Sequence, residues 1–250
     1  MTRDASLLPA GSIRAFLIRM SSTRSTQFRP VGMVLAWIAL ITPLVAQEAA
    51  HVSTAARPTV TFSLDFPQSN PEQYSITVDA GGQTRYECAG KVAEDAEEET
   101  YRAEFELSAR NRERIFGLAK QAKYFAGKID TGNNKLAFTG AKVLSYQDGE
   151  RSNTARYNYS NLEAVRQLTA LFQSMAETLE YGRRLAYDHR YQKLALDDEL
   201  KRMEAQAKNN ELNEIQGVAP ILREIVGDAS VINVVRARAQ ELIQMSESGH

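Results

Sequence analysis

The chain has few of the residues that build covalent or metal-bound frameworks. Among its 250 residues there is one cysteine, Cys88, and there are only three histidines. A single cysteine excludes an intramolecular disulfide and a cysteine-based zinc site. The net charge is −1, so bulk charge gives no attraction to nucleic acid.

Long apolar runs are also scarce. The run at residues 31–45 holds fifteen uncharged residues, whereas a membrane-spanning helix needs about 20. Arginines precede this run and Ala46 ends it, which is the order of a secretory signal cleaved near Ala46. The chain is therefore expected to be secreted or periplasmic, and translation from Met20 would give the signal an ordinary length. The alternative is an uncleaved helix that anchors the protein in the inner membrane.

The part that follows the signal has the composition of a folded protein. Residues 47–250 carry 25 basic and 30 acidic side chains, a mildly acidic balance that disfavours binding to nucleic acid or anionic lipid. Contact with a membrane is expected only through residues 31–45, if they are not cleaved. The apolar fraction of 43% is enough for a core that needs no disulfide.

Residues 58–160 alternate between apolar and polar side chains, the period of half-buried strands. Gly81-Gly82 and Asp148-Gly149 are hairpin signals, and Ser108 can cap the one predicted helix. The expected strands cover residues 60–66, 74–78, 84–88, 101–107, 136–146 with a break near Gly140, and 155–159, and the expected helix covers residues 109–124. The order β-β-β-β-α-β-β predicts an α+β domain, an antiparallel sheet with one packed helix.

Residues 161–250 have helical spacing and predict an all-α module. Ser160 and Glu163 form a capping-box pattern before a helix that is expected to continue past Gly182 toward residue 207. Asn209-Asn210 is the predicted break. Two further helices follow, the first begun by Pro220 and closed by Gly227-Asp228, the second over residues 231–245. Short loops between them favour antiparallel helical hairpins.

Few residues suggest catalysis or metal binding. Cys88 alternates with Tyr86 on a strand, which favours a buried structural thiol over a reactive one. Asp188 adjoins His189, but adjacent helical side chains diverge by about 100°, so this pair cannot act as in a catalytic triad. The acidic stretch at residues 94–99 lacks the ligand spacing of a calcium loop, and Arg183 and other charges of the long helix are expected on a solvated face.

No Gly-x-Ser-x-Gly, phosphate-loop, dinucleotide or paired-histidine zinc motif occurs in the sequence. We therefore expect no catalytic residue, no cofactor and no metal site. Tyrosines offer the remaining candidates, because they give large contact area with a polar tip, although strands enrich tyrosine for packing alone. The candidate binding residues are Tyr74, Tyr86, Tyr157, Tyr159, Tyr187 and His189.

The segment Pro71-Glu-Gln-Tyr74-Ser-Ile-Thr-Val-Asp, followed by Gly82, Tyr86 and Gly90, resembles the opening hairpin of a family of uncharacterised bacterial envelope domains. The resemblance continues through residues 105–125 and 143–159 and covers about residues 59–178. Many members carry Gly-x-Cys-Pro before the tyrosine, whereas this chain has Ser-Asn-Pro71. The resemblance implies the order of elements and an envelope location, and it implies no activity.

These features together predict a non-enzymatic binding or interaction protein with a protein partner in the cell envelope. Two alternatives stay open. The first is a hydrolase-like enzyme with a site near His189, and the second is a structural envelope protein held by residues 31–45. The sequence does not specify the oligomeric state.

Overall fold

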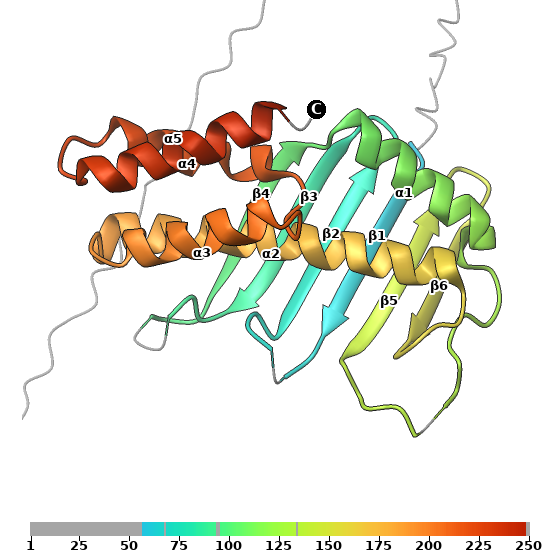
Figure 1. Cartoon of the computed structure of the whole chain (residues 1–250). Coiled ribbons are helices and arrows are strands. Elements are labelled where there is room, and N and C mark those ends of the chain that lie inside the picture. Colours follow the sequence, from blue (N-terminus) through green and yellow to red (C-terminus); the bar gives the residue numbers. More distant parts are fainter. Residues whose placement is uncertain (1–56, 68, 94–95, 134, 249–250) are drawn as a thin grey trace, which may run out of the picture. The chain divides into compact units, whose positions relative to one another are not determined.

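A six-stranded antiparallel sheet forms the centre of the described structure (Figure 1). The computed structural model describes residues 57–248 apart from residues 68, 94–95 and 134. The strands lie in the order β4-β3-β2-β1-β5-β6. Their bounds are β1 Thr59–Asp65, β2 Gln73–Asp79, β3 Gln83–Gly90, β4 Glu99–Glu106, β5 Ala141–Gln147 and β6 Ser152–Tyr157. The predicted α+β class and the order of its elements are confirmed.

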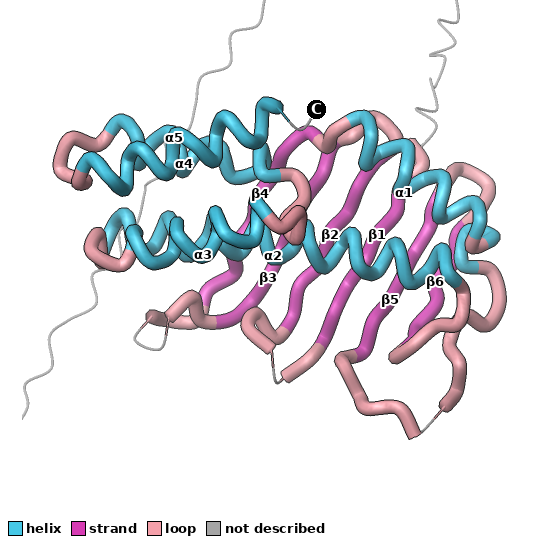
Figure 2. The backbone as a smooth tube through the Cα atoms, in the orientation of Figure 1, coloured by secondary structure: helices cyan, strands magenta, loops and turns pink. Residues whose placement is uncertain are grey.

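Helices cover one face of this sheet. Figure 2 shows α1 (Ala109–Gln121) and α2 (Glu163–Tyr191) crossing the same side of the strands. Every second residue of β1, β2 and β5 is buried beneath them, and the rings of Phe62 and Phe172 stack with their centroids 5.4 Å apart. One packed helix was predicted within the first domain, and the first helix of the C-terminal module packs beside it.

Helix α1 begins as predicted and ends earlier than predicted. The backbone N–H of Asn111 donates to Ser108 Oγ at 3.3 Å, so Ser108 is the N-cap. After Gln121 the chain enters a short 3₁₀ turn, η1 (Lys123–Phe125), in which all three residues have positive φ. The predicted end at residue 124 was therefore wrong, because the left-handed backbone stops the helix.

The segment predicted as one or two strands over residues 136–146 forms one strand, β5, which starts at Ala141. Gly140 precedes it with a φ of +95°, a value that L side chains rarely adopt. A Cβ at Gly140 would also lie only 2.6 Å from Leu64 Cδ1. The bend at this glycine separates residues 136–139 from the sheet.

The C-terminal part forms two helical hairpins. Besides α2, its elements are α3 (Leu196–Lys208), the 3₁₀ turn η2 (Ile215–Val218), α4 (Ala219–Gly227) and α5 (Asn233–Ser248). As predicted, α2 continues past Gly182, Asn209-Asn210 follows the end of α3, and Pro220 stands at the start of α4. The helical pattern toward residue 207 is interrupted between Tyr191 and Leu196.

The predicted capping box is wrong. Leu162 occupies the N-cap of α2 and makes no side-chain cap. Ser160 Oγ accepts from the Leu162 N–H at 3.2 Å, while the Glu163 carboxylate binds the side chains of Arg166 and Gln167 within the first turns. Helix α2 thus starts two residues later than the pattern indicated, and the Glu163 carboxylate bonds within the helix instead of reaching back to Ser160.

The described residues 57–248 belong to one compact unit, and within it α2 packs on the sheet. The domain boundary expected at residue 160 falls in the loop before α2 and stays a prediction. Residues 31–45, expected as a signal or anchor, lie outside the described residues. In the part of the chain that the structure describes, no helix has the length and apolarity to span a membrane.

Candidate functional site

Three of the predicted binding tyrosines lie inside the core. Tyr74, Tyr86 and Tyr157 are buried on the helix-covered face of the sheet. The hydroxyls of Tyr157 and Thr169 are 2.6 Å apart, and burial raises the pKa of Tyr157 to about 12. Tyr159, just beyond β6, is 45% exposed and lies apart from them. The sheet tyrosines therefore join the sheet to α2 instead of forming an outer surface.

Tyr86 belongs to a buried polar network between β3 and α2. Its hydroxyl donates to Glu180 Oε1 at 2.6 Å, and the thiol of Cys88 donates to the same oxygen at 3.2 Å. Arg183, one turn after Glu180, places Nη1 3.6 Å from Glu180 Oε2 and 3.4 Å from Cys88 Sγ, while its Nη2 donates to the carbonyl of Gly90. Glu180 is 4% exposed and Arg183 is 2% exposed. We call these four side chains the Glu180 network.

The network keeps its thiol protonated. Burial first, and then the negative charge of Glu180, raises the pKa of Cys88 to about 12. The same two causes raise the pKa of Tyr86. A thiol with such a pKa carries almost no thiolate at neutral pH and is a poor nucleophile. The prediction of a buried, structural Cys88 is confirmed, with 3% of its surface exposed.

A hollow of about 510 Å³ lies beside this network. Arg183 belongs to both, and its Nε has no hydrogen-bond partner among the described residues. Tyr187 and Tyr191 of α2 stand together with their ring centroids 5.0 Å apart. We call this hollow the tyrosine pocket, and its lining consists of Val92, Ala96, Glu97, Glu99, Tyr101, Arg183, Ala186, Tyr187, Arg190 and Tyr191.

The two walls of the tyrosine pocket carry opposite charges. Arg190 projects from α2, and its guanidinium lies 5.1 Å from the centroid of the Tyr191 ring. Glu97 lies in the segment before β4, and Glu99 is the first residue of β4. Within the described ranges, no ion pair shorter than 4.0 Å engages Arg190, Glu97 or Glu99. Charges of both signs are thus available to a ligand.

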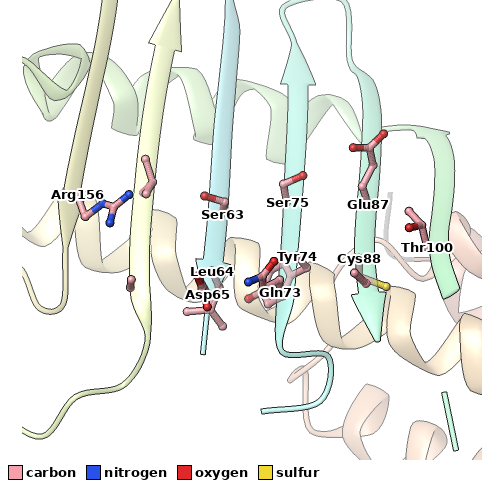
Figure 3. Close-up of a pocket in the computed structure, with 13 residues that line it drawn as sticks. Ser63, Leu64, Asp65, Gln73, Tyr74, Ser75, Glu87, Cys88, Thr100 and Arg156 are labelled. Atoms are coloured by element: carbon pink, nitrogen blue, oxygen red, sulfur yellow. The ribbon is translucent and has the colours of Figure 1, made fainter. Parts of the chain in front are cut away.

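A second hollow lies on the opposite face of the sheet, which no described helix covers. Figure 3 shows the strands in front of the helices, with Ser63 and Ser75 on neighbouring strands at its centre. It measures about 410 Å³, and we call it the open-face groove. Beside it, Arg102 Nε pairs with Glu87 Oε1 at 3.0 Å, and the hydroxyls of Thr61 and Thr77 are 3.1 Å apart. Glu87, which lines the groove, is therefore already paired within the sheet.

His189 takes part in a partly buried cluster at the end of α2. Its Nε2 lies 2.9 Å from Asp228 Oδ2, and Lys193 Nζ lies 2.6 Å from the same oxygen. These partners lower the pKa of Asp228. Ser230 Oγ donates to Asp228 Oδ1 at 2.7 Å and accepts from Lys193. The cluster joins the loop after α2 to the loop before α5.

The sequence did not reveal Glu180 and Arg183 as site residues. Arg183 was expected on a solvated helix face, which is wrong. A signal was present, since Phe172, Leu179 and Arg183 lie on the same apolar stripe at helical spacing. Arg183 can be buried on this stripe because Glu180 pairs with its charge and the Gly90 carbonyl accepts a hydrogen bond from it. Tyr187 is the one predicted candidate that lines the tyrosine pocket.

Comparison with protein-family models and with curated proteins finds no match for this chain. The resemblance to envelope domains therefore stays a prediction. In the described part of the chain, no three histidine, cysteine, aspartate or glutamate side chains gather as they would around a metal ion.

Proposed function

We propose that this chain is an exported, non-enzymatic binding protein that takes a small polar ligand in the tyrosine pocket. The observation that carries the proposal is the pocket itself, whose lining combines three tyrosines with the buried Arg183 and the exposed Arg190. Ligand sites combine such apolar or aromatic walls with a few placed polar groups.

The Glu180 network supports this proposal through rigidity. Arg183 is held by Glu180, Cys88 and Gly90 from the sheet and the helix together. A side chain that is fixed before binding loses little conformational entropy when a ligand arrives. Arg183 therefore gives the pocket a rigid part of its wall.

Ligand binding can be tested on the full-length protein with saturation-transfer NMR and a library of small polar compounds. Tyr191→Leu should abolish the signals of the compounds that bind, because it removes a pocket wall. Tyr159→Leu is the matched control, since both tyrosines are exposed and Tyr159 lies outside the pocket. Compounds that bind equally well to both variants would contradict the proposal.

Export is the second part of the proposal and rests on the sequence at residues 1–46. Expression of the full chain with N-terminal sequencing should find a mature protein that begins near residue 47 in the soluble envelope fraction. A protein that keeps residues 31–45 and stays in the membrane pellet after a high-salt wash would instead support the anchored structural protein.

A protein partner in the envelope is the second candidate function, and the loop tips favour it. Leu194, between α2 and α3, is 95% exposed, and Ile232, before α5, is 60% exposed. Contacts of Lys193 with Asp228 and Ser230 hold the two loops together. Cross-linking in envelope extract should yield one partner that the Leu194→Ser variant loses and Leu162→Ser, an exposed leucine at the other end of α2, retains. A partner kept by both variants would exclude this surface.

A further inference from the structure

We infer that the ligand of the tyrosine pocket carries both an ammonium and a carboxylate group, as an amino acid or a short peptide does. This inference rests on the proposed function and adds the chemical class of the ligand. Its basis is the pairing of a cationic wall with an anionic wall across one hollow.

The cationic wall belongs to α2. Arg190 is exposed, and among the described residues its guanidinium contacts the ring of Tyr191. Arg183, below it, already has Glu180 as its counter-ion, so its charge is largely balanced. Arg190 therefore supplies the free positive charge, and a carboxylate is the group that a guanidinium binds most specifically.

The anionic wall belongs to the chain that enters β4. Glu97 and Glu99 both line the pocket and are exposed, whereas the intervening Glu98 lines a different hollow. Neither pocket glutamate pairs with a lysine or arginine of the described residues. An ammonium group would give these carboxylates a charge-assisted partner.

A zwitterion matches the two walls together. A ligand with one charge would be attracted by one wall and repelled by the other, and a neutral ligand would use neither charge. Tyr101, Tyr187 and Tyr191 supply aromatic surface for the remainder of the ligand. The volume of about 510 Å³ lies within the range of about 300–1,000 Å³ for ligand sites, so a short peptide can enter as well as one amino acid.

Titration calorimetry of the full-length protein with the dipeptides Ala-Phe, Phe-Ala and Gly-Lys tests this inference. Each bound dipeptide is compared with its N-acetyl form, which lacks the ammonium group, and with its C-terminal amide, which lacks the carboxylate. We expect each cap to weaken binding about tenfold or more, as a lost charge-assisted hydrogen bond does. Binding that neither cap weakens would overturn the inference.

Variants assign each charge to its wall. Arg190→Gln should weaken binding of the free dipeptide and leave the affinity for the amide form unchanged. Glu99→Gln should likewise weaken binding of the free dipeptide, and it should leave the affinity for the N-acetyl form unchanged. Glu98→Gln is the matched control and should bind like the wild type. Equal effects of Glu98→Gln and Glu99→Gln would contradict the assignment of the anionic wall.

The failure of this inference differs from the failure of the proposed function. Maltose tests a neutral ligand, and choline and benzoate test ligands of one charge. If one of these binds, if Tyr191→Leu abolishes that binding, and if the dipeptides do not bind, the ligand class is wrong but the pocket remains a binding site. If dipeptides, sugars and ions all fail to bind the wild type, both are overturned.

Discussion

The tyrosine pocket and the open-face groove share strand β4, and the Glu180 network beside the pocket shares β3 with the groove, yet the two hollows are made differently. Tyr101 and Cys88 face α2, where Cys88 joins the Glu180 network. Their neighbours Thr100 and Glu87 point to the other side and line the groove (Figure 3). Because side chains alternate along a strand, a step of one residue separates a buried charged network from a solvated surface.

The comparison shows which of the two hollows depends on a buried charge that the fold must hold. The wall of the tyrosine pocket includes Arg183, which the fold must hold in place against the cost of burying a charge. The groove lies over the strands themselves, and its flanking charges pair near the surface, as Arg102 does with Glu87. The pocket side should therefore respond strongly to substitution and the groove side only weakly.

The largest effect is expected for Glu180→Ala. This change leaves Arg183 buried without its counter-ion, and breaking a buried pair costs about 3–5 kcal/mol. Urea unfolding followed by circular dichroism measures the loss. Glu87→Gln, which alters β3 on the groove side, should change the free energy of unfolding by less than about 0.5 kcal/mol. Equal losses in the two variants would remove the distinction between the two sides.

The next effect concerns the packing of α2 near the pocket. A Cβ at Gly182 would lie 2.5 Å from Val218 Cγ1, so Gly182→Ala should push η2 away from α2 and cost about 1–3 kcal/mol. Gly117→Ala in α1 is the matched control, because a Cβ there meets nothing within 4 Å. The higher helix propensity of alanine should raise the free energy of unfolding of that variant by about 0.5–1 kcal/mol. Thermal unfolding measures both variants. Stabilisation by both changes would contradict the close packing.

A smaller, pH-dependent effect is expected from Asp188. Burial, and then the charge of Glu199, raises the pKa of Asp188 from 3.8 to about 6. The folded protein then binds this proton more tightly than the unfolded chain, so the contribution of Asp188 to stability falls as the pH rises from about 4 through 6.

Asp188→Asn removes this pH dependence. We expect the variant to be more stable than the wild type by roughly 1 kcal/mol at pH 7, allowing for solvent screening, and equally stable near pH 4. Denaturant unfolding at several pH values measures the difference. A difference that stays constant from pH 4 to pH 7 would show that the carboxylate does not titrate in this range.

The smallest effect is expected in the open-face groove. Ser75→Ala removes a hydroxyl at its centre and should change the free energy of unfolding by less than about 0.5 kcal/mol. It should also leave ligand binding unchanged. If Ser75→Ala weakened binding as strongly as Tyr191→Leu, the groove would be the binding surface.

Local patterns were enough to predict most of the fold. Alternation located the strands, Ser108 the cap of α1, and Pro220 the start of α4. The errors arose where a distant contact or an unusual backbone decides the outcome. Lys123 has positive φ, and a glycine is needed at position 182 because Val218 packs against it. Neither fact follows from the nearby sequence.

The candidate site was harder to predict for the same reason. Tyr86 and Glu180 lie 94 residues apart in the sequence, so no spacing rule connects them. Tyr187 was a candidate because tyrosines gather around it, but its neighbour Arg183 was taken for a surface charge. Only the packing of α2 on β3 shows that this arginine is buried and that a hollow lies beside it.

The most direct test of the central proposal is NMR of the full-length protein with labelled tyrosine rings, titrated with the strongest ligand from the compound screen. Single Tyr→Phe variants assign the signals. Binding in the tyrosine pocket should shift the signals of Tyr101, Tyr187 and Tyr191 and leave those of Tyr157 and Tyr159 in place. A bound ligand that leaves the three pocket signals unchanged would contradict the proposal.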